Sequence, residues 1–252
     1  MKYLVGDIGN TLTKFALLSP KFTILKSFNI QTSKLNSKKN RDIFLKKILK
    51  INFNKKILFS SVVPSTFKSI KKYLKKKNLK VFEIKNLNLK NIIRIKIKKY
   101  NQLGSDRIAN AVGAFYKLKH NCLIVDFGTA TTFDIVKTPG TYEGGVIAPG
   151  ISLSIKDLSK NTALLPIVKL KYKSKIYGKN TKEAINAGFI WGYQGLINNI
   201  IKKINKTEKF KYKVILTGGY SNLFKKFVDE KTIVDEDITI KGIIRIYKEL
   251  LL

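Results

Sequence analysis

The feature that most constrains the fold of this chain is a motif that occurs twice. An apolar run ends in Asp7 and is followed by an apolar residue, a glycine and small polar residues. The same order returns around Asp126, 119 residues later. Repetition of a whole motif indicates that one structural unit has been copied. We therefore predict an α/β fold of two duplicated halves, each opening with an antiparallel hairpin and continuing with strand–helix units.

Apolar patterning supports this plan along the chain. Three apolar runs with short polar breaks predict a three-stranded meander over residues 2–30. Further strands are expected, from the runs of β-prone residues, at 57–59, 81–82, 122–126, 131–136, 144–148 and 214–216. Helices are expected, from the helical spacing of apolar residues, at 38–50, from 64, at 106–118, 151–159, 181–204, after 219 and at 238–250. We place the boundary between the halves near 117–121, which gives domains at 1–117 and 118–252.

Composition excludes several classes of protein. Hydrophobic residues make up 44% of the 252 residues, which is enough for a core and excludes a disordered basic tail. No apolar run approaches the roughly 18 residues that a membrane span needs. The single cysteine, Cys122, excludes an internal disulfide framework. We therefore expect a cytoplasmic protein with no membrane partner.

The formal net charge of +34 raises the alternative of a nucleic-acid-binding or transcription-accessory protein. Only four of the 50 basic residues are arginine, the residue that binds bases and phosphates with two parallel hydrogen bonds. The lysines are spread over the whole chain among many isoleucines and asparagines, as codon drift in an AT-rich genome would produce. We therefore expect no specific nucleic-acid partner.

The first candidate site is the segment that begins at Asp7. Gly9 lets the backbone approach a phosphate closely, and the hydroxyl of Thr11 or Thr13 can donate to phosphate oxygens. Lys14 adds a positive charge, and Asp7 at the strand end is placed to hold Mg²⁺ directly or through water. The alternative is an ordinary hairpin turn with a surface lysine. The repetition of the motif at Asp126 favours a phosphate site.

The second and third candidate sites lie in the second half. Gly128 and Thr129 repeat the phosphate-binding arrangement, and Asp126 is placed for a cation. The pair Gly218 and Gly219 follows a strand and precedes a helix, which suits a phosphate or nucleoside at a helix N-terminus. A plain strand-to-helix turn is the alternative for this third segment.

The fourth candidate site opens the helix expected at 106–118. Ser105 is a candidate N-cap, and Asp106 would favour the helix dipole. The functional alternative makes Asp106 a general base and Arg107 a clamp for an anion.

Duplicated halves with two Asp–Gly hairpins and a Gly–Gly turn resemble the acetate and sugar kinase/Hsp70/actin superfamily. Its fold, the actin-like ATPase fold, has two ribonuclease H-like halves with a cleft between them. Within it the details are similar to the type III pantothenate kinases. The segments that carry the resemblance begin at Asp7, Tyr100, Asp126, Gly144, Thr162, Gly178 and Thr217.

The resemblance implies ATP-dependent phosphorylation of pantothenate to 4′-phosphopantothenate, the first step of coenzyme A biosynthesis. It implies a homodimer that uses Mg²⁺ with ATP and a monovalent cation, K⁺ or NH₄⁺, at Asp126. The implied ATP-binding residues are Asp7, Ile8, Gly9, Asn10, Thr11, Leu12, Thr13, Lys14 and Thr129. The implied pantothenate-binding residues are Tyr100, Gly104, Ser105, Asp106, Arg107 and, across the dimer interface, Thr181.

In the implied mechanism Asp106 accepts the proton of the primary hydroxyl of pantothenate as that hydroxyl attacks the γ-phosphorus. Mg²⁺ and Lys14 offset the charge on the phosphoryl oxygens. Another small-molecule kinase of the same superfamily, such as a sugar kinase, is the alternative within this class. The Cys and His cluster of a hexokinase-like zinc motif is absent from the sequence.

Overall fold

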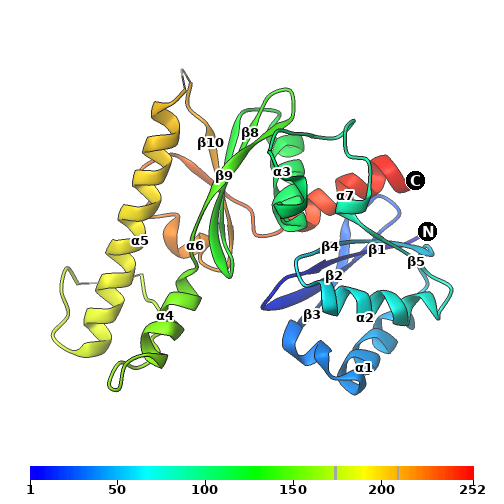
Figure 1. Ribbon diagram of the computed structural model, residues 1–252, viewed down its shortest axis with the longest axis horizontal. Coiled ribbons are helices and arrows are strands. Elements are labelled where there is room, and N and C mark those ends of the chain that lie inside the picture. The colour runs from blue at the N-terminus through cyan, green and yellow to red at the C-terminus, as the bar shows by residue number, and fades with distance from the viewer. Residues whose placement is uncertain (173–174, 209) are drawn as a thin grey trace. The chain divides into compact units, whose positions relative to one another are not determined.

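The computed structural model describes residues 1–172, 175–208 and 210–252 (Figure 1). They form two compact units. The first unit contains Met1–Lys119, Pro139–Tyr142 and Asp237–Leu252, and the second contains His120–Thr138 and Glu143–Glu236. No helix in the described residues is long and apolar enough to cross a membrane.

The first unit is built on a five-stranded sheet in the order β3-β2-β1-β4-β5. Its strands are β1 (Tyr3–Ile8), β2 (Leu12–Leu18), β3 (Ile24–Gln31), β4 (Lys56–Ser61) and β5 (Lys80–Glu83). β1, β2 and β3 pair antiparallel in sequence, which confirms the predicted meander. β4 and β5 then add in parallel beside β1, as strand–helix units require.

The helices of the first unit are α1 (Lys38–Leu49), α2 (Pro64–Lys75), α3 (Ser105–Leu118) and α7 (Ile238–Leu251). The side chain of Ser37 caps α1 by accepting from the Asn40 amide, and Pro64 starts α2 at the position where its missing N–H costs nothing. Leu45 of α1 and Ile70 of α2 are buried in the core against the sheet. The helices predicted by periodicity therefore form where expected.

The second unit repeats this plan. Its strands are β7 (Cys122–Phe127), β8 (Ala130–Lys137), β9 (Thr141–Pro149), β10 (Lys213–Gly218) and β11 (Thr232–Val234), in the order β9-β8-β7-β10-β11. The first two residues of β9 belong to the first unit. β7 is antiparallel to β8 and parallel to β10, as β1 is to β2 and β4. The second sheet has a short sixth strand at its edge, described below, but its other five strands have the same order as the first sheet. This shared order confirms the predicted duplication.

The helices of the second unit are α4 (Ile151–Lys160), α5 (Thr181–Lys206) and α6 (Ser221–Phe224). Ile190, Ile197 and Ile201 of α5 enter a core that includes Leu123 and Val125 of β7. A two-residue strand, β6 (Arg94–Ile95), pairs with the first two residues of β9. Neither β6 nor β11 was predicted, because strands of two or three residues contain too little alternation to be detected.

Candidate active site

The turn between β1 and β2 is held by hydrogen bonds from two sides. The Gly9 amide donates to the Leu12 carbonyl oxygen at 3.0 Å and closes the turn. Thr32 donates from its amide to Thr11 O at 3.0 Å and from its hydroxyl to Gly9 O at 2.6 Å. A Cβ at position 9 would lie 3.0 Å from the Leu12 oxygen, so glycine is favoured there. The turn is therefore preorganised, with Asn10 exposed at its tip.

Some side chains of this turn are exposed to solvent and others are buried in the core. Thr11 and Leu12 are exposed, whereas Ile8 and Thr13 are fully buried. The Thr13 hydroxyl lies 2.9 Å from the Thr32 hydroxyl. Of the two threonines predicted to donate to phosphate, Thr11 is thus the one at the surface, and the hydroxyl of Thr13 supports the turn.

Lys14 is held by an aspartate from the opposite end of the chain. It lies opposite Asp7 in the β1–β2 pair, and its Nζ donates to Asp237 Oδ1 at 2.5 Å within the first unit. The Lys14 side chain is 24% exposed, so a phosphate oxygen can reach it only in competition with Asp237. Asp237 was not predicted as part of the site, because 223 residues separate it from Lys14.

The turn between β7 and β8 has a related construction. The Gly128 amide donates to Ala130 O at 3.1 Å, and Gly128 and Thr129 are exposed. Gly150 is the N-cap of α4, and a Cβ there would overlap the Thr129 carbonyl group. The N-terminus of α4 therefore packs directly on this turn, and the positive end of a helix dipole favours an anion nearby.

Asp126 faces the third glycine turn, at Gly218, which lies in the same unit. Gly218 has φ = +81°, and a Cβ there would lie 2.6 Å from both Asp126 Oδ1 and the Phe127 carbonyl oxygen. The Gly219 amide donates to that carbonyl oxygen at 3.1 Å. A side chain would thus fill the space beside these oxygens. Carboxylate and carbonyl oxygens are the donors that hard cations prefer, so this set fits a potassium-like ion.

The segment before α3 shapes the environment of Asp106. Its Oδ1 accepts from the Arg107 amide at 2.7 Å, and a Cβ at position 104 would overlap the same oxygen. Burial raises the pKa of Asp106, and the hydrogen bond from the Arg107 amide only partly opposes this. A carboxyl with a raised pKa is a better proton acceptor than an ordinary aspartate, as general base catalysis requires.

The expectation that Ser105 caps α3 is wrong. Gly104 is the N-cap and makes no side-chain cap bond, and Ser105 is the first helical residue. The Ser105 hydroxyl is fully buried, 2.5 Å from Glu83 Oε1 and 2.9 Å from Ser61 O. Its partners lie on β4 and β5, so the hydroxyl points into the unit.

Glu83 contacts Ser105 of the candidate site, and the sequence did not predict this role. It ends β5, is 7% exposed, and accepts from the Lys85 amide at 2.8 Å. The available signal was the scarcity of acids, since residues 1–126 contain only five. Tyr100 lies in a short 3-10 helix, and burial raises the pKa of its phenol.

The remaining predicted pantothenate-binding residues lie on different units. The Arg107 guanidinium lies 6.0 Å from the ring centroid of the buried Tyr142, within the first unit. Thr181 is the exposed first residue of α5 in the second unit. The N-cap Asn180 accepts from the Glu183 amide at 3.0 Å and fixes the start of that helix.

Each unit therefore assembles its own part of the candidate site. The first unit carries the turn at Gly9, Lys14 and the segment at Asp106, and the second carries Asp126 and the turn at Thr129. The expectation that these parts meet in one cleft stays a prediction. Among the described residues, no group of three or more His, Cys, Asp or Glu side chains gathers as a metal cluster.

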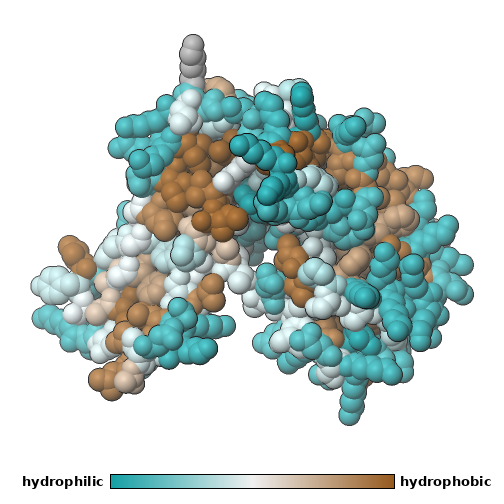
Figure 2. All heavy atoms as spheres, viewed as in Figure 1, coloured by the Kyte–Doolittle hydropathy of each residue, from teal (hydrophilic) through white to brown (hydrophobic). Residues whose placement is uncertain are grey.

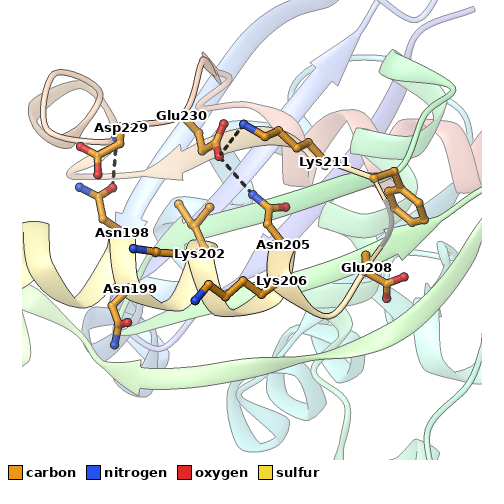
Figure 3. A pocket seen from close by; sticks show the side chains of 11 residues that line it. Asn198, Asn199, Lys202, Asn205, Lys206, Glu208, Lys211, Asp229 and Glu230 are labelled. Atoms are coloured by element: carbon orange, nitrogen blue, oxygen red, sulfur yellow. Dashed lines mark hydrogen bonds and ion pairs between the residues drawn. The ribbon is translucent and has the colours of Figure 1, made fainter.

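A pocket of about 820 Å³ lies beside the C-terminal part of α5 (Figure 3). Its polar groups bond one another: Asn205 Nδ2 donates to Glu230 Oε1 at 3.3 Å, and Lys211 Nζ lies 3.7 Å from that oxygen. Lys211 precedes β10 and Glu230 precedes β11, whereas Asp126 and Gly218 lie near the C-terminal ends of β7 and β10. The pocket is therefore at the opposite edge of the sheet from the candidate site.

The duplicated sheets and their glycine turns define the class: the chain has the actin-like ATPase fold shared with sugar kinases. One solved structure with this fold is the inorganic polyphosphate/ATP-glucomannokinase from Arthrobacter sp. strain KM. It matches with a TM-score of 0.55 and 12% identity, over 98% of each chain.

The sequence comparisons are more specific. The model of the type III pantothenate kinase family matches residues 3–203. The type III pantothenate kinase of Pelagibacter ubique (strain HTCC1062) is 46% identical over 96% of this chain and 97% of its own. That of Persephonella marina is 36% identical over 96% of each. This chain belongs to the type III pantothenate kinase family.

Proposed function

We propose that this protein transfers the γ-phosphoryl group of ATP to pantothenate and forms 4′-phosphopantothenate, the first step of coenzyme A biosynthesis. The observation that carries this proposal is family membership over nearly the whole chain. The half-buried Asp106, with its raised pKa, is the group suited to accept the proton of the attacking hydroxyl.

ATP would be bound by the two glycine turns. In the first unit we assign the backbone around Gly9 and the exposed residues Asn10 and Thr11 to the phosphates, with Lys14 offsetting their charge. In the second unit Thr129 and the N-terminus of α4 offer further donors. Lys14 would exchange its ion pair with Asp237 for one with a phosphate oxygen.

Pantothenate would be bound by the segment from Tyr100 to Arg107. The guanidinium of Arg107 is suited to pair with the carboxylate of pantothenate. Asp106 would hold the proton of the primary hydroxyl at its carboxylate as the oxygen attacks the phosphorus. Ser105 would contribute through its backbone, because its hydroxyl is buried against Glu83.

Two cations are part of the proposal. Mg²⁺ arrives with ATP and neutralises phosphate charge when bound, and Asp7 offers a half-buried carboxylate for it, directly or through water. A monovalent cation, K⁺ or NH₄⁺, would be held by Asp126 and the Phe127 carbonyl oxygen beside Gly218. We also place the enzyme in the cytoplasm, which suits its single, buried cysteine, Cys122.

We further propose a homodimer that uses the part of α5 from Gly188 to Gly195. Gly188, Gly192 and Gly195 follow one another at helical spacing, and a Cβ at any of them meets no described atom within 4 Å. Hydrophobic residues interrupt the hydrophilic surface over α4 and this part of α5 (Figure 2). Leu164 and Ile176 are more than four-fifths exposed. Such a surface is typical of a protein–protein contact.

The experiment that tests the reaction is a pantothenate-dependent ATP-consumption assay, run with and without potassium. We expect turnover that needs pantothenate and rises with potassium. D106N should lower kcat by a factor of about 10²–10⁴, with ATP binding retained. The matched control is D42N, which replaces a carboxylate of α1 that pairs with Arg41. Turnover of D106N at the wild-type rate would refute the assignment of the base.

A further inference from the structure

At the contact between Glu83 and Ser105, the Ser105 hydroxyl has one proton but lies close to two acceptor oxygens. Ser105 Oγ lies 2.5 Å from Glu83 Oε1 and 2.9 Å from the Ser61 carbonyl oxygen, and both side chains are buried. A hydroxyl has a single proton to donate. If Glu83 is ionised, two acceptors compete for that proton, and a buried acceptor without a full hydrogen bond is costly. If Glu83 is protonated, each oxygen can be satisfied.

In the protonated arrangement the carboxyl O–H of Glu83 donates to Ser105 Oγ, and the Ser105 hydroxyl donates to Ser61 O. The other oxygen, Glu83 Oε2, still accepts from the Lys85 amide at 2.8 Å. The Ser61 amide also donates to the Glu83 carboxyl, which can accept it in this arrangement. The chain of bonds runs from the end of β5 through the first residue of α3 to the end of β4.

We propose that protonated Glu83 is a positioning residue that, through Ser105, fixes the first turn of α3 and with it the carboxylate of Asp106. Asp106 directly follows Ser105, so a shift of that residue shifts the proposed base. A misplacement of about 1 Å at a reacting group can lower a rate 10²-fold. The inference rests on the proposed function, because it assigns the chemical step to Asp106.

The surroundings of Glu83 support its neutral form. Burial raises the pKa of Glu83, and this effect outweighs the hydrogen bonds and the charge of Lys85, which favour ionisation. The Lys85 ammonium group is drawn to the Asn101 carbonyl oxygen, to which it donates at 2.8 Å. Burial raises the pKa of the Tyr100 phenol, so this neighbour of Glu83 stays neutral and adds no charge.

The test compares E83Q, E83A and S105A in the same pantothenate-dependent assay, with folding followed by thermal unfolding. A glutamine is neutral and can donate from its amide to Ser105 Oγ, as the protonated acid does. We expect E83Q to keep kcat within about threefold of wild type, and E83A to lose about tenfold or more in kcat with the KM for ATP unchanged. D42N serves again as the control.

S105A provides a second test if E83A fails to fold. It removes only the hydroxyl oxygen of Ser105 and is therefore the smaller change to the core. We expect S105A to lower kcat as E83A does, and the E83A/S105A double variant to lose no more than E83A alone. A wild-type kcat in E83A or S105A, or an equal loss in E83Q and E83A, would overturn the inference. A wild-type enzyme without pantothenate-dependent turnover would instead refute the proposed function.

A direct readout is independent of activity. The infrared spectrum of the wild-type protein at neutral pH should contain the carbonyl band of a protonated carboxylic acid, which E83Q lacks. If the difference spectrum contains carboxylate bands in its place, Glu83 is ionised and the proposed chain of hydrogen bonds does not exist.

Discussion

At the scale of single residues, the proposed base depends on the absence of a side chain two positions earlier. Gly104 has φ = −65° and ψ = 142°, a conformation that alanine adopts freely. A Cβ there would overlap Asp106 Oδ1 and lie 3.4 Å from Val62 Cγ1. The overlap is with the end of a side chain, so the carboxylate can move while the helix stays in place.

We therefore expect G104A to fold with nearly wild-type stability and to lose about tenfold or more in kcat. Steady-state kinetics and thermal unfolding of the same preparation check both parts. Unchanged kcat in a folded G104A would show that the position of the Asp106 carboxylate is unimportant for turnover.

The raised pKa of Asp106 also sets a pH dependence. A base must be ionised to accept a proton, and burial moves its ionisation above the ordinary aspartate value of 3.8. kcat/KM should therefore fall as pH is lowered through this raised pKa and level off above it. A profile of kcat/KM against pH checks this. If kcat/KM falls only at or below a pH of 3.8, the pKa of the base is not raised, and the assignment of Asp106 as that base is contradicted.

The residues of the site were predictable where a local motif contains them. Asp7, Gly9 and Asp126 follow from the repeated turn alone. The partners of Lys14 and Ser105 did not follow, because Asp237 and Glu83 are distant in sequence and meet these side chains only in the folded chain. A motif predicts which residues do chemistry, but the groups that orient them depend on tertiary contacts.

At the scale of elements, α3 and α7 pack closely because glycines face each other's backbone. A Cβ at Gly242 of α7 would overlap the carbonyl group of Ala109 in α3. A Cβ at Gly113 would likewise overlap Ile238 O. Periodicity predicted both helices, but not that α7 would pack in the first unit on a helix that lies more than a hundred residues earlier.

We expect G242A to destabilise the protein by about 1–3 kcal/mol or more, because the overlap is with backbone atoms that cannot turn away. The control is K203A at an exposed position in the C-terminal part of α5. K203A should change the stability by no more than about 0.5 kcal/mol. Urea unfolding of the two variants checks the difference, and equal stabilities would contradict the close packing.

At the scale of the whole molecule, duplication gives two similar sheets different tasks. Both units place an aspartate near the end of their central strand beside a glycine turn. The first unit adds Lys14 and Asp106, and the second adds Asp126, which we propose for a monovalent cation, and the exposed face of α5. This division of roles and the arrangement of the units around a shared nucleotide both stay predictions.

The exposed face of α5 makes the proposed dimer testable in one substitution. Gly192 has open space around it, so a leucine there fits within the single chain and improves helix propensity. The same leucine would block the approach of a second copy. We expect the wild-type protein to sediment as a dimer and G192L as a monomer at equal concentration.

Thr181 stands at the start of the same helix and is exposed, so the dimer should also complete the proposed pantothenate site. We expect G192L to raise the KM for pantothenate while ATP binding is retained, because the ATP-binding turns lie on other elements. The control, K202L, places a leucine on the C-terminal part of α5 and should stay dimeric and active. A monomeric wild type, or a G192L protein that remains dimeric, would refute the use of this face.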